Sequence, residues 1–384
     1  MHAPGPWRWS ALALAMLVAV ATGIRAQSSD PAAAAALVAP LMRPPAEFDG
    51  KLGSYRSPLL FDDGRVVKTA AEWPRRRAEI LARWQALLGP WPAMLERVPL
   101  EVLSETHRET FTQRRVRLEV SPGQRIEGWL LVPDGLSGRA PAVLVPFYEP
   151  ETSVGLGERP QRDFARQLTR AGFVTLAIGT PGGDARRPDR ATVTAQPLSY
   201  YAYVAANAWT ALAALPYVDP ARIGVVGHSY GGKWSLFAGA LWDRFAAVAT
   251  SDPGIVFDES RSNVNYWEPW YLGFEAGRSR RPGLVAADNP RTGPYARMMA
   301  EGRDLHELHA LIAPRPFFVS GGAEDPPERW VALNHLVAVN TLLGVSGRVG
   351  MSNRATHDPT PESNAQLVAF FVHSLAGGAA PPRP

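Results

Sequence analysis

The sequence predicts an α/β protein built on a mostly parallel sheet of eight strands with helices on both faces. From residue 142 onward, short continuous apolar runs alternate with longer segments of helical periodicity. Such runs are typical of strands buried on both faces, as in a parallel sheet covered by helices. The chain of 384 residues is 46% hydrophobic and 20% charged, so it has enough apolar sequence for a large core.

The expected elements follow one another in a regular order. A helix is predicted between Asp62 and Leu88, with Thr69 as its N-cap. Segments 115–120 and 126–132 alternate apolar and polar residues, which predicts an antiparallel pair at one edge of the sheet. Further strands are predicted at 142–145, 174–178, 223–226, 246–249, 317–319 and 348–351, and helices at 162–171, 199–215, 231–241, 330–343 and 361–375. This alternation implies right-handed crossovers between parallel strands.

The N-terminus resembles a secretory signal. Ala11 to Ala21 is an unbroken apolar run, and Ile24-Arg25-Ala26 is an acceptable cleavage site. The run is too short to span a bilayer, so we expect a periplasmic or secreted protein with no stable membrane insertion after cleavage. The expected division of the chain is a signal peptide at 1–26, a lead-in and helical region at 27–110, the main domain at 111–376 and a flexible tail at 377–384.

Composition excludes several classes of protein. The absence of cysteine excludes a disulfide scaffold, a zinc ribbon, an iron–sulfur site and a thiol nucleophile. The net charge is only +4 and no basic block or tail is present, so we expect no nucleic-acid partner.

The strongest functional motif is Gly227-His228-Ser229-Tyr230-Gly231, which directly follows a predicted buried strand and directly precedes a predicted helix. That context is the one a nucleophile elbow requires, because the sharp turn demands small residues around an exposed serine. A serine hydroxyl needs a base, and His357 lies in the loop after the last predicted strand, where a base in this architecture belongs.

The acid that would orient His357 has three candidates. Glu324 and Asp325 follow the seventh predicted strand, and Asp252 follows the sixth. Each carboxylate could instead cap its own loop, and the sequence leaves the choice open.

An oxyanion needs two backbone N–H donors. We expect the first from Tyr230, directly after the serine, and the second from Phe147 or Tyr148, in the loop after the third predicted strand.

Lys233 is one of only three lysines among 40 basic residues, and it lies four positions after the serine. A compact, rotatable ammonium suits donation to a sugar hydroxyl or carboxylate, although the side chain could simply cover a helix flank.

The segment 258–303 interrupts the strand–helix alternation after the sixth strand and has the place of a substrate-covering lid. Within it Trp267, Glu268 and Trp270 could stack on a sugar ring and accept from its hydroxyls, or pin the lid to the core.

Three longer stretches resemble bacterial glucuronoyl esterases and related carbohydrate esterases of the α/β-hydrolase superfamily; they lie within residues 63–80, 218–233 and 304–316. The resemblance implies a lysine at position 233 that contacts the sugar. It also implies an acid at the end of the sixth strand, where this chain has Asp252 in place of the usual Glu. The family favours Arg directly after the nucleophile, whereas this chain has Tyr230.

We therefore expect a secreted serine esterase that hydrolyses glucuronoyl, methyl or acetyl esters of polysaccharides through an acyl-enzyme, without a metal or organic cofactor. One alternative is a prolyl-oligopeptidase-like peptidase, although about a hundred residues before the first strand are too few for a propeller. Another is a catalytically silent carbohydrate-binding protein with the same fold.

Overall fold

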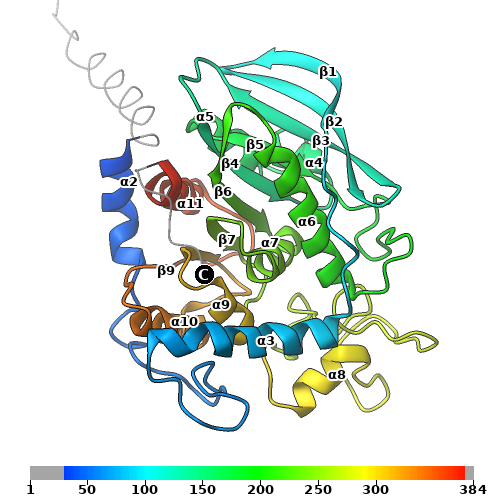
Figure 1. Cartoon of the computed structure of the whole chain (residues 1–384), viewed down its shortest axis with the longest axis vertical. Helices are drawn as coiled ribbons and strands as arrows, with labels where there is room; N and C mark the ends of the chain where they lie inside the picture. The colour runs from blue at the N-terminus through cyan, green and yellow to red at the C-terminus, as the bar shows by residue number, and fades with distance from the viewer. Residues whose placement is uncertain (1–29, 377–384) are drawn as a thin grey trace, which may run out of the picture.

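The computed structural model describes residues 30–376, whose centre is a single sheet flanked by helices (Figure 1). The strands are β1 (Glu101–Arg108), β2 (Phe111–Ser121), β3 (Gln124–Pro133), β4 (Ala140–Pro146), β5 (Val174–Ile178), β6 (Val218–His228), β7 (Ala247–Ser251), β8 (Phe317–Gly321) and β9 (Val349–Asn353). The α-helices are α2 (Pro31–Val38), α3 (Trp73–Leu88), α4 (Pro150–Ser153), α5 (Phe164–Arg170), α6 (Pro197–Ala213), α7 (Tyr230–Leu241), α8 (Gly293–Ala300), α9 (His306–Ile312), α10 (Trp330–Leu342) and α11 (Pro361–Phe371).

The sheet is mixed, with the strand order β1-β2-β3-β5-β4-β6-β7-β8-β9. The pairs β1–β2, β2–β3 and β3–β5 are antiparallel, and the remaining pairs are parallel. The predicted α/β class is thus confirmed, but the sheet within residues 30–376 has nine strands rather than eight. The missed strand, β1, is exposed along most of its length, so no apolar alternation marks it. It also lies before residue 111, where we expected the main domain to begin.

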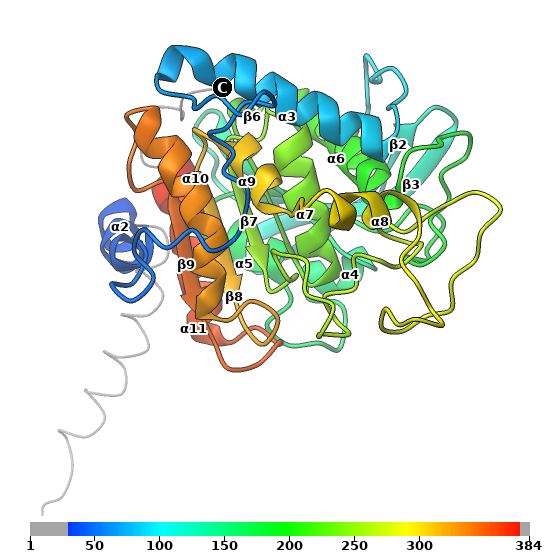
Figure 2. The same ribbon diagram turned by 90° about the horizontal axis from the view of Figure 1, so that it is seen from below.

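Two hydrophobic cores form on the two faces of the sheet. In β4, Ala142 and Leu144 point to the face covered by α3, α6, α7, α9 and α10, whereas Val143 and Val145 point to the face covered by α2, α5 and α11. Figures 1 and 2 show α2 beside α11 on the second face. Because β4 is buried on both faces, its sequence is continuously apolar instead of alternating.

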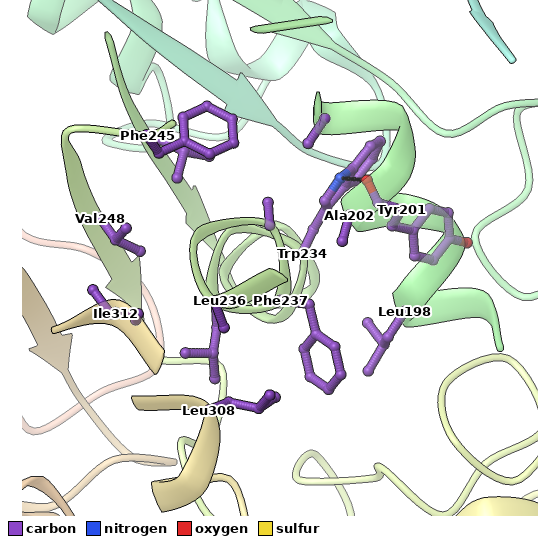
Figure 3. Close-up of a cluster of buried hydrophobic side chains, with 14 of the residues drawn as sticks. Leu198, Tyr201, Ala202, Trp234, Leu236, Phe237, Phe245, Val248, Leu308 and Ile312 are labelled. Carbon is purple, nitrogen blue, oxygen red and sulfur yellow. Dashed lines mark hydrogen bonds between the residues drawn. The ribbon is translucent and has the colours of Figure 1, made fainter. Parts of the chain in front are cut away.

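Helix α7 lies at the middle of the larger core and is buried almost all round. Figure 3 shows Phe237 and Leu236 extending from it toward α6 and α9, while Trp234 packs against α6. The indole N–H of Trp234 also donates a hydrogen bond to the carbonyl of Tyr201 in α6. This packing fixes the start of α7 and thereby the residue that precedes it, Ser229.

The expected signal peptide at 1–26 and the expected tail at 377–384 lie outside the described residues. Among residues 30–376, no helix is long and apolar enough to cross a membrane.

Three histidines are buried close together, and two of them lie beneath the segment that leads into α3. His306 Nε2 lies 2.8 Å from the carbonyl of Arg56, and His335 Nε2 lies 3.0 Å from the carbonyl of Leu52. The rings of His306 and His335 have centroids 5.0 Å apart. Burial lowers the pKa of His306 to about 4 and that of the neighbouring His309 to about 3.

These shifts predict a loss of stability in acid. Because the folded-state pKa of His309 lies below the ordinary value near 6.5, the unfolded chain takes up the proton first. The neutral His309 side chain therefore contributes its full stabilising free energy above about pH 6.5, and this contribution is lost as the pH falls toward 3. We expect the free energy of unfolding of His309→Leu, relative to that of wild type, to rise by about 1.4 kcal/mol for each unit by which the pH falls below 6. Urea unfolding between pH 8 and 5 measures this gain. The exposed His373, changed to Leu, is the control, and parallel pH curves for wild type and His309→Leu would contradict the expectation.

Candidate active site

Ser229 lies at a sharp corner between β6, which ends at His228, and α7, which begins at Tyr230. Its backbone has φ 53° and ψ −114°, a strained conformation for a residue other than glycine. The corner is also tight. A Cβ on Gly227 would lie 2.2 Å from the carbonyl oxygen of Gly231, and a Cβ on Gly231 would lie 2.1 Å from that of Pro146. This is the strand–corner–helix context that the motif predicts.

A chain of hydrogen bonds joins Ser229 to two other residues that are distant in sequence. His357 Nε2 lies 2.9 Å from Ser229 Oγ, and His357 Nδ1 lies 2.8 Å from Asp252 Oδ2. Ser229 and His357 are partly exposed, whereas Asp252, at the end of β7, is fully buried. The imidazole is therefore held between a hydroxyl at a partly exposed corner and a buried carboxylate.

The structure brings Asp252, and neither of the other two candidate acids, to His357. The backbone N–H groups of Glu324 and Asp325 both donate to the Asp252 carboxylate, at 3.1 and 2.8 Å. Their own side chains turn elsewhere, with Glu324 accepting from Asn263 at 3.0 Å. The hypothesis that Asp325 or Glu324 contacts the imidazole is therefore wrong for this structure.

Asp325 makes the reverse contact: it lies in the loop after β8, and its side chain binds the loop after β7. Its carboxylate accepts from the N–H groups of Gly254 at 2.9 Å and Ile255 at 2.6 Å. Burial and the nearby charge of Asp252 raise the pKa of Asp325 to about 6. Each of the two loops thus holds the other through a buried carboxylate and a pair of backbone donors. We call this reciprocal arrangement the carboxylate clamp.

Sequence reasoning missed Arg354, which supports the loop that carries His357. Its guanidinium donates to the carbonyls of Ser320 at 2.9 Å, Gly321 at 3.2 Å, His357 at 2.6 Å and Asp358 at 2.9 Å. Burial lowers the pKa of Arg354, and the nearby charges of Asp252, Asp325 and Asp358 act against that shift. In a chain so rich in arginine, only its place three residues before His357 could have drawn attention to it.

A second histidine lies against His357. The rings of His228 and His357 have centroids 4.7 Å apart, and His228 Nδ1 lies 3.1 Å from Ser251 Oγ. Burial lowers the pKa of His228 well below its usual range, so this ring is neutral and packs as an uncharged neighbour of His357. The sequence placed His228 inside the motif but offered no reason to give it a part in the site.

Of the backbone N–H groups expected to bind an oxyanion, those of Tyr230 and Tyr148 are free within the described part of the chain and that of Phe147 is not. The Tyr230 N–H begins α7 and has no acceptor among the described residues. The Phe147 N–H donates to the Ile178 carbonyl at 3.0 Å and is not free, so the expectation for Phe147 is wrong. The neighbouring Tyr148 N–H has no acceptor within residues 30–376, so of these two residues only Tyr148 has a free N–H.

Tyrosine rings form a wall beside Ser229. The rings of Tyr230 and Tyr148 stack with centroids 4.4 Å apart, and Tyr201 meets Tyr230 edge-on at 5.3 Å. Tyr230 Oη lies 3.2 Å from Thr180 Oγ1. We call Tyr148, Tyr201, Tyr230 and Tyr271 the tyrosine wall. A cleft of about 380 Å³ opens next to it; its lining includes Tyr148, Thr180, Gly182, Glu149 and Glu151.

Lys233 is enclosed rather than open to a ligand. Its Nζ donates to the carbonyls of Pro253 and, at 3.4 Å, Asn263, and lies 4.3 Å from the centroid of the Tyr266 ring. Burial lowers the pKa of Lys233 to about 8. The ammonium therefore stabilises the base of the insertion, and a contact with sugar stays an untested prediction.

Two of the three candidate sugar-binding residues in the insertion do not reach the site surface. Trp267 is fully buried, and Glu268 is buried in an ion pair with Arg280 at 3.1 Å. The prediction that Trp267 and Glu268 stack on a sugar ring or bind its hydroxyls is therefore wrong, because both side chains pack and bond within the insertion. Trp270 is only partly buried, and the guanidinium of Arg186 lies 5.3 Å from its ring centroid.

Two sequence comparisons match parts of the chain. Residues 167–291, which include Ser229, match the prolyl oligopeptidase family. A 4-O-methyl-glucuronoyl methylesterase of Sodiomyces alcalophilus is 28% identical over 126 residues, which are 32% of this chain and 24% of that protein. The chain thus matches only about a quarter of the length of this relative.

Solved structures are similar over most of the chain. A glucuronoyl esterase from Solibacter usitatus has a TM-score of 0.65 and 21% identity, covering 84% of this chain and 98% of the other. A promiscuous CE15 esterase from a marine bacterial metagenome has a TM-score of 0.63 and 18% identity, covering 85% and 99%. The chain therefore has the α/β-hydrolase fold and resembles glucuronoyl esterases and related carbohydrate esterases.

Proposed function

We propose that the protein is a serine hydrolase that cleaves carboxylic esters of polysaccharides. The observation that carries the proposal is the continuous hydrogen-bond chain from Ser229 through His357 to Asp252, which begins at a strained, partly exposed corner. A hydroxyl, an imidazole and a buried carboxylate in this order have the geometry of an activated nucleophile.

The proposed reaction has two halves. Ser229 Oγ attacks the ester carbonyl while His357 Nε2 takes its proton, and the carbonyl oxygen becomes an oxyanion near the Tyr230 N–H. The intermediate collapses to an acyl-enzyme as His357 returns the proton to the leaving alcohol. Water then attacks the acyl group with the same proton transfers and releases the acid and free Ser229. Asp252 accepts from Nδ1–H throughout and stabilises the imidazolium.

The carboxylate clamp gives Asp252 its orientation. Its two oxygens accept from Glu324, Asp325 and His357, so the side chain has no freedom to rotate away from the imidazole. Arg354 fixes the His357 side of the contact between Asp252 and the imidazole by donating a hydrogen bond to the His357 carbonyl. A base held in this orientation before the substrate binds needs little further loss of entropy to reach the reactive geometry.

Glucuronoyl, methyl and acetyl esters of polysaccharides are the proposed substrates, and the likeness to glucuronoyl esterases supports this class. Tyr230 stands where the family favours Arg, which supports methyl and acetyl esters as well as glucuronoyl esters. We also propose export to the periplasm or the medium after cleavage near residue 26. N-terminal sequencing of the mature protein from each cell fraction tests that step.

A fluorophosphonate probe tests the nucleophile. Wild-type protein should be labelled, Ser229→Ala should not be, and Ser262→Ala, which changes an exposed serine of the insertion, should be labelled like wild type. Wild type is then assayed on methyl glucuronate, methyl galacturonate, acetylated xylan and feruloyl esters. Absence of labelling would overturn the serine hydrolase, whereas labelling without turnover of any sugar ester would overturn only the substrate class.

A second candidate is a peptidase, which the match of residues 167–291 to the prolyl oligopeptidase family favours. The described residues contain one sheet with its helices and no propeller. Cleavage of a prolyl-peptide nitroanilide, faster than cleavage of every ester in the panel, would make the peptidase the better assignment.

A further inference from the structure

Several cations around the proposed site already have acceptors within the protein. Lys233 donates to two backbone carbonyls, and Arg354 donates to the carbonyls of Ser320, Gly321 and His357. Arg162 is paired with Asp358 beside His357. None of these groups is available to an anionic substrate without losing a contact that supports the site.

Arg186 differs from these three cations. Its side chain is exposed, and among residues 30–376 its guanidinium has neither an ion-pair nor a hydrogen-bond partner. It is nevertheless placed, because the guanidinium lies 5.3 Å from the ring centroid of Trp270. Its backbone N–H also donates to Asp184 Oδ1 at 2.9 Å, which fixes the loop. Stacking on an aromatic face holds a guanidinium while leaving its N–H edges free.

The loop of Arg186 is attached to the tyrosine wall on two sides. Tyr201 Oη donates to the carbonyl of Ala185 at 2.9 Å, and the Tyr201 ring meets the ring of Tyr230, the residue after Ser229. On the other side, the Trp270 ring lies 6.2 Å from the Tyr271 ring, which lies 6.4 Å from that of Tyr230.

The electrostatics agree with this placement. Burial raises the pKa of the Tyr148 phenol, and hydrogen bonding to Tyr271 and the positive charge of Arg186 act against that rise. Arg186 is thus close enough to influence the exposed end of the wall that borders the nucleophile.

We propose that Arg186 is a specificity-determining residue that binds a uronate carboxylate of the substrate chain, next to the esterified sugar. The proposal rests on the proposed function and adds to it a preference for acidic polysaccharides. The planar guanidinium matches a carboxylate through two parallel N–H donors. Because Trp270 already restrains the side chain, less rotamer entropy is lost when the carboxylate binds.

Inhibition by oligosaccharides tests the proposal without requiring the natural ester. Xylo-oligosaccharides with a glucuronate branch, and the same oligosaccharides without it, compete with 4-nitrophenyl acetate hydrolysis by the full chain. We expect the acidic inhibitor to bind wild type more tightly. Arg186→Gln should raise its Ki about tenfold, equivalent to ~1.4 kcal/mol, and leave the neutral Ki unchanged. Arg187→Gln, which removes the adjacent exposed arginine, is the matched control and should leave both values unchanged.

Three results would overturn the proposal: equal Ki values for the acidic and neutral inhibitors in wild type, equal losses in Arg186→Gln and Arg187→Gln, or an unaltered acidic Ki in Arg186→Gln. Failure of the proposed function is seen separately as absence of fluorophosphonate labelling and of 4-nitrophenyl acetate turnover. In that case the same oligosaccharides are titrated calorimetrically into wild type and the two arginine variants. A selective loss of acidic binding in Arg186→Gln then supports the carboxylate site, and its absence overturns it.

Discussion

Asp252→Asn is expected to lower kcat toward ester substrates by about ten-thousandfold while the protein remains folded. The Asn amide cannot act as the charged partner of the imidazole, and it favours the tautomer in which Nε2 carries the proton. His357 then cannot accept the proton of Ser229 Oγ, from which its Nε2 lies 2.9 Å. Steady-state kinetics on 4-nitrophenyl acetate measure the loss, and circular dichroism verifies the fold.

Asp325→Asn is the matched control for this prediction, because Asp325 is equally buried and belongs to the same carboxylate clamp. The variant loses charge-assisted hydrogen bonds from Gly254 and Ile255. It should therefore be less stable by about 1–3 kcal/mol yet keep kcat within about tenfold of wild type. If instead Asp325→Asn were nearly inactive and Asp252→Asn active, the acid would belong to the loop after β8.

Gly231→Ala is expected to destabilise the protein by about 3 kcal/mol or more and to abolish fluorophosphonate labelling. The added methyl group would lie 2.1 Å from the carbonyl oxygen of Pro146, which belongs to the backbone of β4 and cannot turn aside. Relief of the clash must therefore move α7 away from the sheet, and Ser229 moves with it. Urea unfolding and probe labelling measure the two effects.

Gly232→Ala is the control, since its added Cβ would lie 3.0 Å from a side-chain carbon of Pro253 and 3.2 Å from the nearest backbone oxygen. Small shifts relieve such contacts, so the loss should be about 1 kcal/mol with labelling retained. Similar stability and labelling for Gly231→Ala and wild type would show that the corner is looser than its backbone contacts indicate.

The sequence predicted the α/β class, the corner at Ser229 and the place of His357 because each depends on local patterns. Buried strands are continuous apolar runs, and the corner requires glycines at fixed spacing. The acid depends on which way neighbouring loops turn their peptide groups. Local patterns left Asp252, Glu324 and Asp325 open because all three follow buried strands, and only the resemblance to glucuronoyl esterases pointed to the end of the sixth predicted strand, where Asp252 lies.

The wrong expectations have a similar origin. An aromatic-rich insertion fits a sugar platform and an internal core equally well, and only burial shows that Trp267 belongs to the core. Phe147 and Tyr148 are neighbours in one loop, but the bond from Phe147 N–H to Ile178 removes one of the two as a donor. Strand β1 was missed because its exposed residues carry no hydrophobic signal.

Main-chain atoms of Gly227, Gly231 and Pro146 meet at the bend that presents Ser229. A larger residue at either glycine forces the backbone apart, so a substitution there displaces the reactive hydroxyl itself. The residue after the serine is held differently, because the Tyr230 ring is buried and stacks on Tyr148. A redesign of ester preference through position 230 therefore has to rebuild the tyrosine wall as well.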